Sequence, residues 1–141
     1  PIPPGMTDAP RSIETSIATV SLTGPRFVEQ RIKPTARFET EGLKENNEAL
    51  EQLCNGTLCA VLVVIPAEVP VNLPVVNVDH FRSEREKRCI LAMAVVTDSA
   101  IMHATAKLYF MYFQQAFPAK VFEEEGDART WLKEQLTADQ P

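Results

Sequence analysis

The sequence predicts an α/β fold, and the strongest evidence lies in its C-terminal third. The apolar run Ile90–Val96 has the length and composition of a strand that is buried on both faces. Thr97-Asp98-Ser99 then supplies a helix start, with Asp98 or Ser99 as the N-cap, and residues 100–115 are predicted to be helical. A short strand at 120–122 and a helix capped by Asp127 follow. Strand, helix, strand and helix in close succession indicate a compact α/β layer.

The N-terminal part predicts a disordered tail followed by a β-hairpin. Residues 1–12 are rich in proline and small polar residues, so a single domain is expected over residues 13–137. Residues 13–22 alternate apolar and polar side chains as a half-buried strand does, and residues 27–33 repeat the pattern after a Gly-Pro turn. The flanking prolines predict that this antiparallel hairpin lies at a sheet edge.

The middle of the chain predicts one helix and one central strand. Residues 40–54 carry apolar side chains at helical spacing, and Asn55-Gly56 is typical of a left-handed helix end. Asn47 interrupts the apolar stripe, either as a hydrogen-bonded edge residue or as a ligand contact. Leu58–Ile65 is apolar without alternation, so it should lie centrally with both faces covered.

Less regular sequence separates this strand from the C-terminal third. Prolines in residues 66–78 exclude an interior strand and make this long loop a candidate functional segment. Residues 79–89 are predicted to form a short helix whose mixed charges face solvent rather than a phosphate or an acidic partner.

The composition limits the possible classes of protein. With 141 residues and 45% hydrophobic content, the chain is long enough for one globular domain with a sizeable core. A net charge of -5 argues against non-specific nucleic-acid binding, which requires a basic face. No apolar run reaches the roughly 20 residues that a membrane-spanning helix needs, so no membrane span is predicted.

Three cysteines, Cys54, Cys59 and Cys89, occur without a C-x-x-C pair. Because Cys54 and Cys59 lie within apolar segments, buried thiols are the favoured interpretation, and a Cys54–Cys59 disulfide or a metal site remains an alternative. The N-terminus also lacks the basic and apolar segments of a secretory signal. Together these features predict a reducing, cytoplasmic location.

The helix at 100–116 carries more apolar side chains than one sheet-facing side requires. Five of its residues are enough to cover a sheet: Met102, Ala106, Tyr109, Phe110 and Phe113. The surplus apolar residues are Ile101, Leu108, Met111 and Tyr112. A neighbouring helix, a second copy of the chain or a ligand pocket would each account for them. His103 is interpreted as a surface or packed histidine, because no second metal-ligand pattern accompanies it.

Taken together, residues 13–136 resemble the SpoIIAA-like branch of the STAS fold. The resemblance rests on the strand Leu91–Ser99, the aromatic segment Tyr109–Phe113, the strand Pro118–Phe122 and, most specifically, the Ala-x-x-Trp-Leu within Asp127–Leu132. It implies a four- or five-stranded mixed sheet with the N-terminal hairpin and about four helices, packed mainly on one side. It also implies a cytoplasmic, usually non-catalytic module with a regulatory or ligand-binding role.

The same resemblance raises the question of a phosphorylation switch. In STAS anti-sigma-factor antagonists, an Asp-Ser-Ser-Gly-like turn after the central strand carries the phosphorylated serine. This chain departs from that pattern, because Pro66 follows Ile65. Ser83 is the serine left in this region, and Glu84 and Glu86 would oppose a phosphate there. Phosphorylation of Ser83 is retained as an alternative only.

The sequence favours binding over catalysis. It contains no G-x-S-x-G, P-loop, dinucleotide or H-E-x-x-H motif, so no enzyme, cofactor or metal is predicted. Asp98-Ser99 ends a central strand, where open α/β sheets place their sites, although a helix cap also explains both residues.

Two functions are compatible with these patterns. The first is a non-enzymatic protein-interaction module, a homodimer with a regulatory partner protein. Its predicted contact residues are Asp98, Ser99, Tyr109, Met111 and Tyr112. The alternative is a carrier of small apolar ligands or lipids, similar in topology to the CRAL-TRIO fold, with the surplus aromatic residues lining its cavity.

Overall fold

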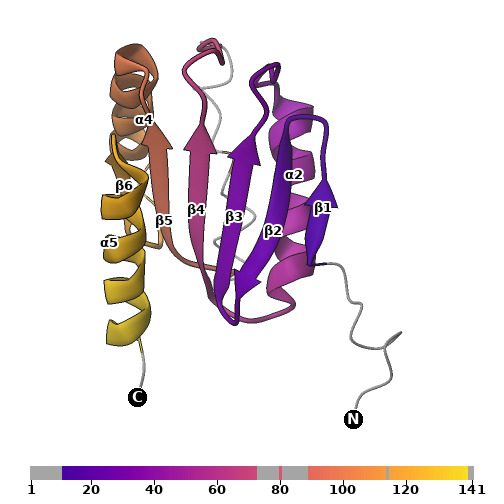
Figure 1. The fold of residues 1–141 in the computed structure, drawn as a ribbon, viewed down its shortest axis with the longest axis vertical. Helices are drawn as coiled ribbons and strands as arrows, with labels where there is room; N and C mark the ends of the chain where they lie inside the picture. The colour runs from indigo at the N-terminus through magenta and orange to yellow at the C-terminus, as the bar shows by residue number, and fades with distance from the viewer. Residues whose placement is uncertain (1–10, 73–79, 81–88, 114, 140–141) are drawn as a thin grey trace.

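The described part of the chain forms one six-stranded mixed sheet. The computed structural model describes residues 11–72, 80, 89–113 and 115–139. The strands are β1 Ser12–Glu14, β2 Ala18–Gly24, β3 Phe27–Ile32, β4 Cys59–Ile65, β5 Ile90–Thr97 and β6 Ala119–Phe122. They lie side by side in chain order (Figure 1), with β1 to β3 antiparallel and β3 to β6 parallel. The mixed sheet and its hairpin, β2–β3, are as predicted.

One predicted strand is in fact two strands, and the sheet therefore has six strands rather than four or five. The segment 13–22 turns back on itself between β1 and β2. Thr15 makes this turn, because its hydroxyl oxygen accepts the backbone N–H groups of Ile17 and Ala18 at 3.3 and 3.0 Å. The flanking prolines predicted that the β2–β3 hairpin lies at the edge of the sheet. This prediction is wrong, because β1 pairs with the outer side of β2.

Three α-helices pack on this sheet within the described residues. They are α2 Thr40–Cys54, α4 Ala100–Tyr112 and α5 Glu125–Ala138. About four were predicted, and the remaining one, at 79–89, lies outside the described residues except for His80 and Cys89. Two helices share one face, α2 against β2 and β3 and α4 against β5 and β6, whereas α5 covers β4 to β6 on the opposite face (Figure 1).

Local capping contributes to two of these helix ends, the C-terminus of α2 and the N-terminus of α4. α2 has the predicted bounds, and Asn55 ends it in the left-handed conformation with a φ of 48°. Ser99 caps α4, its hydroxyl accepting the backbone N–H of Met102 at 3.2 Å. α4 ends at Tyr112 rather than at residue 115. α5 begins at Glu125, so Asp127 lies in its first turn and does not cap it as predicted.

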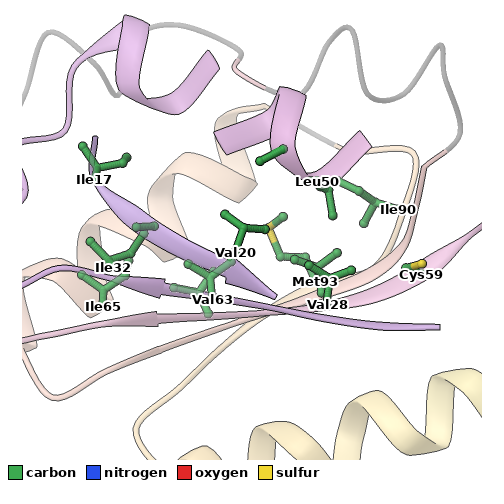
Figure 2. Close-up of a cluster of buried hydrophobic side chains, with 14 of the residues drawn as sticks. Ile17, Val20, Val28, Ile32, Leu50, Cys59, Val63, Ile65, Ile90 and Met93 are labelled. Carbon is green, nitrogen blue, oxygen red and sulfur yellow. The ribbon is translucent and has the colours of Figure 1, made fainter. Parts of the chain in front are cut away.

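The larger core fills the space between the sheet and the pair α2 and α4. On β4, Val61, Val63 and Ile65 point to this side, whereas Ala60 and Leu62 point toward α5. Figure 2 shows the larger core gathered between the sheet and α2, with α5 beyond the sheet. β4 is therefore covered on both faces, as its unbroken apolar run predicted.

The three cysteines belong to this core as free, buried thiols. Cys54 ends α2, Cys59 begins β4 and Cys89 precedes β5. Hydrogen bonds with Cys59 and Cys89, together with burial, raise the pKa of the Cys54 thiol far above its ordinary value. The predicted buried thiols are confirmed.

A smaller core lies between α5 and the sheet. Small side chains at Ala60, Ala92 and Ala94 let the helix approach the strands closely. Leu132 of α5 is fully buried against them, and its burial stabilises the fold by about 2 kcal/mol. Trp131 is half-buried beside it, so this helix turns an apolar side toward the sheet.

Four charged side chains also join α5 to β3. Arg31 and Arg129 each contact both Glu29 and Glu125, with N–O distances of 2.9 to 3.0 Å. Burial by itself raises the pKa of Glu29, but hydrogen bonds from Thr23 and Arg129 outweigh it and lower that pKa below its ordinary value. Hydrogen bonds from Arg31 and Arg129 likewise lower the pKa of Glu125.

This ion-pair network predicts a loss of stability in acid. The pKa values of Glu29 and Glu125 are lower in the folded chain than in the unfolded one, where a glutamate has a pKa of about 4.3. The network therefore stabilises the fold above that pH, and the contribution is lost as the pH falls through the folded values. Arg129→Met should lower the free energy of unfolding by about 1 kcal/mol at neutral pH. It should also make this free energy fall less steeply as the pH is lowered.

Urea unfolding followed from neutral pH to about pH 3 measures both effects. Lys133→Met, which removes an exposed cation from the same helix, is the matched control and should change neither quantity. Equal effects of the two substitutions would show that the contacts of Arg129 with β3 do not stabilise the fold.

The smaller core predicts that Leu132 anchors α5. Leu132 is fully buried, so Leu132→Ala should cost about 2–5 kcal/mol of unfolding free energy, because a packed core relaxes only partly into the cavity that such a truncation leaves. Leu136→Ala removes the same atoms from a half-buried position of the same helix and should cost clearly less. Chemical denaturation compares the two, and equal losses would contradict the anchoring role.

Candidate functional site

α4 separates two environments, which makes it the centre of the candidate site. On its inner side, Met102 is buried and Ala106 and Phe110 pack against the larger core. On its outer side lie the surplus apolar residues that the sequence singled out. They are Ile101, Leu108, Met111 and Tyr112, and between 63 and 80% of each is exposed. The predicted division of this helix into a covered and an uncovered side is confirmed.

These four residues form one continuous surface, named here the apolar stripe of α4. Leu108 lies seven residues after Ile101, and Met111 and Tyr112 follow Leu108 by three and four residues. Such spacings place side chains on one side of a helix. Within the described residues, the stripe contains all the large apolar side chains that are exposed. A neighbouring helix, one of the predicted explanations, does not cover them in the described part of the chain.

Behind α4, a pocket of about 130 Å³ opens between the two helices that share a face of the sheet. It is named here the α2–α4 pocket. Ile32, Val63 and Met93 line it from the adjacent strands β3, β4 and β5. Leu43 lines it from α2 and Phe110 from α4. Among the described helices, α2 packs on β2 and β3 and α4 on β5 and β6, so the main contacts of both helices miss β4, and the pocket lies between the two helices.

Two amide side chains interrupt the apolar lining of this pocket. Gln30 of β3 is only 5% exposed and Asn46 of α2 only 2%. The Nε2 of Gln30 and the Nδ2 of Asn46 have no hydrogen-bond partner. A buried donor that lacks a partner costs about 1–3 kcal/mol, so a folded chain rarely keeps two of them in one pocket.

A small hydrogen-bonded group forms part of the lining of the pocket. Asn47 donates its amide N–H to the backbone carbonyl of His80 at 2.7 Å, and the backbone N–H of His80 donates to the Tyr109 hydroxyl at 2.8 Å. The rings of His80 and Tyr109 also stack, with centroids 6.1 Å apart. Asn47 is thus hydrogen-bonded, as one of its two predicted interpretations required, and it also lines the pocket.

The predicted contact residues do not form one site. Asp98 is exposed and Ser99 is the N-cap of α4, so the capping explanation accounts for Ser99. Both lie at the opposite end of the helix from Met111 and Tyr112, and the rise along the helix axis from Ser99 to Met111 is roughly 18 Å. Tyr109 faces the pocket instead of the stripe.

Other predicted features carry less information. Ser83 lies outside the described residues, and so does the predicted loop 66–78 beyond Asn72. The described residues hold no group of His, Cys, Asp or Glu side chains that could bind a metal ion, and His103 is half-buried on α4. No helix in those same ranges is long and apolar enough to cross a membrane.

Gln30 and Asn46 are the residues that the sequence reasoning missed. Each occupies an apolar position in its own pattern. Gln30 lies between Val28 and Ile32 on the same, covered face of a strand, and Asn46 precedes Leu50 by one helical turn. A polar residue at such an apolar position is the signal that could have identified them. The sequence pattern indicated Asn47, whereas the buried, unpaired amide is that of the preceding residue, Asn46.

Comparison with known proteins agrees with this architecture. A crystal structure of an uncharacterized protein from the DUF3478 family of Shewanella loihica PV-4, described as having a SpoIIAA-like fold, matches 86% of this chain and 90% of its own. The TM-score is 0.54 and the identity 14%, so the similarity shows the fold alone. It confirms the SpoIIAA-like resemblance of the sequence. No curated protein matches.

A family model assigns the sequence more directly. The model described as Domain of unknown function (DUF7793) matches residues 28–136, from the hairpin's second strand to the last helix. The matched span includes Gln30, Asn46 and the whole of α4, so both the α2–α4 pocket and the apolar stripe fall within it. The chain is therefore a member of the DUF7793 family, and its domain has a SpoIIAA-like fold.

Proposed function

We propose that this domain is a non-enzymatic interaction module that pairs with a second copy of itself through the apolar stripe of α4. The observation that carries the proposal is the concentration of exposed apolar side chains on a single helix. The described residues expose four large apolar side chains, and all four lie on this stripe. A contiguous apolar surface of this kind marks an interaction site more often than scattered single residues do.

The chemistry of the stripe favours a like partner. Its four members are uncharged, and the exposed Ala104 between Ile101 and Leu108 leaves room for a facing side chain. In a two-fold symmetric pair, the same stripe would contribute from both protomers and each would cover the other. Tyr112 and Met111 suit such an interface, because aromatic and methionine side chains are enriched at interface cores.

The size of the stripe sets the strength of the pair. α4 has 13 residues and is about 20 Å long, so two such helices bury less area than the roughly 1,200–2,000 Å² of a standard stable interface. A dimer that dissociates on dilution through the micromolar range is therefore expected. The free buried thiols among the described residues are consistent with action in the reducing cytoplasm, which is part of the proposal.

The carrier alternative is not supported for lipids. The α2–α4 pocket has a volume of about 130 Å³, below the roughly 300–1,000 Å³ of pockets for drug-sized ligands. An acyl chain needs more room than this pocket provides. The apolar residues of the stripe do not line it either, because they face away from the sheet.

A charge placed on the stripe should separate the protomers. Met111→Lys puts an ammonium group into the proposed interface, where its desolvation opposes association, while the exposed position tolerates the change in the monomer. Sedimentation velocity from about 1 to 200 μM should show a concentration-dependent dimer for the unmodified chain and a monomer for Met111→Lys.

Lys107→Glu is the matched control, because it changes the charge of the same helix beside the stripe. It should leave the dimer in place. A chain that stays monomeric over the whole concentration range would sink the proposal, and so would a dimer that Met111→Lys leaves intact.

A further inference from the structure

We propose that the α2–α4 pocket binds a compact, neutral molecule through a hydrogen-bond acceptor such as a carbonyl oxygen. The amide N–H groups of Gln30 and Asn46 would hold the acceptor, and the apolar lining would hold the rest of the molecule. This site lies on the inner side of α4 and does not depend on self-association through the outer side.

The orientation of the Asn46 amide is set by its neighbour. The Thr15 hydroxyl accepts two backbone N–H groups, so its own proton is free to be donated. Two acceptors lie within reach of this proton. Oδ1 of Asn46 is 2.5 Å from the Thr15 hydroxyl oxygen and the Ala18 carbonyl oxygen is 3.2 Å from it, so the hydroxyl donates to Asn46. Because Oδ1 is used in this way, the NH₂ end of Asn46 is the unpaired end, and Asn46 is one of the residues that line the pocket. The site therefore presents a donor at this position.

Gln30 supplies a second donor from the sheet. It lies on β3 between Val28 and Ile32, which are buried on the same side of the strand. Its Nε2 is enclosed and has no hydrogen-bond partner, and its side chain lines the same pocket as Asn46. An apolar residue would fill this position without leaving a donor unpaired. Two unpaired donors that line one small apolar pocket, from a strand and a facing helix, indicate recognition of an acceptor group.

The lining restricts the class of ligand. No lysine or arginine is among the described residues that line the pocket, and the His80 imidazole is the one lining group among them that can become cationic, so a carboxylate or phosphate would be buried without a permanent opposite charge from these residues. A volume of about 130 Å³ is close to the roughly 150 Å³ of an engineered apolar cavity that holds benzene. The expected ligand is consequently a single-ring or similarly compact molecule, with a ketone, aldehyde, ester or amide oxygen.

Three probes of nearly the same shape test this class. Acetophenone carries the carbonyl oxygen, α-methylstyrene replaces that oxygen with a methylene group, and benzoate replaces the ketone with a carboxylate. Titration of the full ¹⁵N-labelled chain, followed by NMR, gives a dissociation constant for each probe. It also shows whether the side-chain amide signals of Gln30 and Asn46 respond.

Acetophenone is expected to bind saturably and to shift both amide signals. It should bind at least about tenfold more tightly than α-methylstyrene, which leaves the donors unpaired, and than benzoate, which brings an unpaired charge. Gln30→Met keeps the length of the side chain and removes one donor. It should therefore reduce the ratio of the α-methylstyrene and acetophenone dissociation constants. Gln52→Met, on the exposed side of α2, should leave it unchanged.

A second pair of variants tests the location. Ala106→Leu adds bulk on the pocket side of α4 and should abolish binding of all three probes. Ala104→Leu makes the same change on the exposed side of that helix and should have no effect. Met111→Lys should bind acetophenone as the unmodified chain does, which keeps this test independent of the dimer.

Several results would overturn the proposal. They are the absence of saturable acetophenone binding, equal affinities for acetophenone and α-methylstyrene, and tighter binding of benzoate than of acetophenone. Retention of acetophenone binding in Ala106→Leu would place any bound probe elsewhere on the protein.

Discussion

The constraint on which this structure depends is the burial of β4 and β5 on both faces. These two strands are apolar along nearly their whole length, and they pair in parallel at the middle of the sheet. Neither can tolerate water on either side, so helices must cover both faces. One helix, α5, covers one face through Leu132 and the ion pairs to β3. On the other face, α2 packs on β2 and β3 and α4 packs on β5 and β6.

The division of that second face between two helices produces both candidate sites. α2 and α4 sit over opposite parts of the sheet, and the α2–α4 pocket lies between them over β3, β4 and β5. α4 has only one side in contact with the sheet, so the apolar residues around its remaining circumference stay exposed. The pocket and the apolar stripe are therefore the inner and outer consequences of one packing arrangement.

The polar groups of the pocket stand out against this apolar frame. Gln30 and Asn46 each occupy a position that an aliphatic residue would fill at lower free-energy cost, because both leave a buried donor unpaired. Asn46 has one compensating contact, from Thr15, whose hydroxyl also forms the turn between β1 and β2. The turn that adds a sixth strand to the sheet thus also orients a side chain of the pocket.

The sequence by itself determined the α/β class, the central strands, the bounds of α2, a helix cap at Asp98 or Ser99 and the two-sided character of α4, because these follow from local periodicity and capping. Tertiary structure alone decided the rest. Whether Thr15 breaks a strand depends on hydrogen bonds made after folding, and the network that ties Glu29 to Arg129 joins residues far apart in the chain. The pocket could not be predicted, because it depends on how far apart α2 and α4 lie on the sheet, and no local sequence pattern encodes that separation.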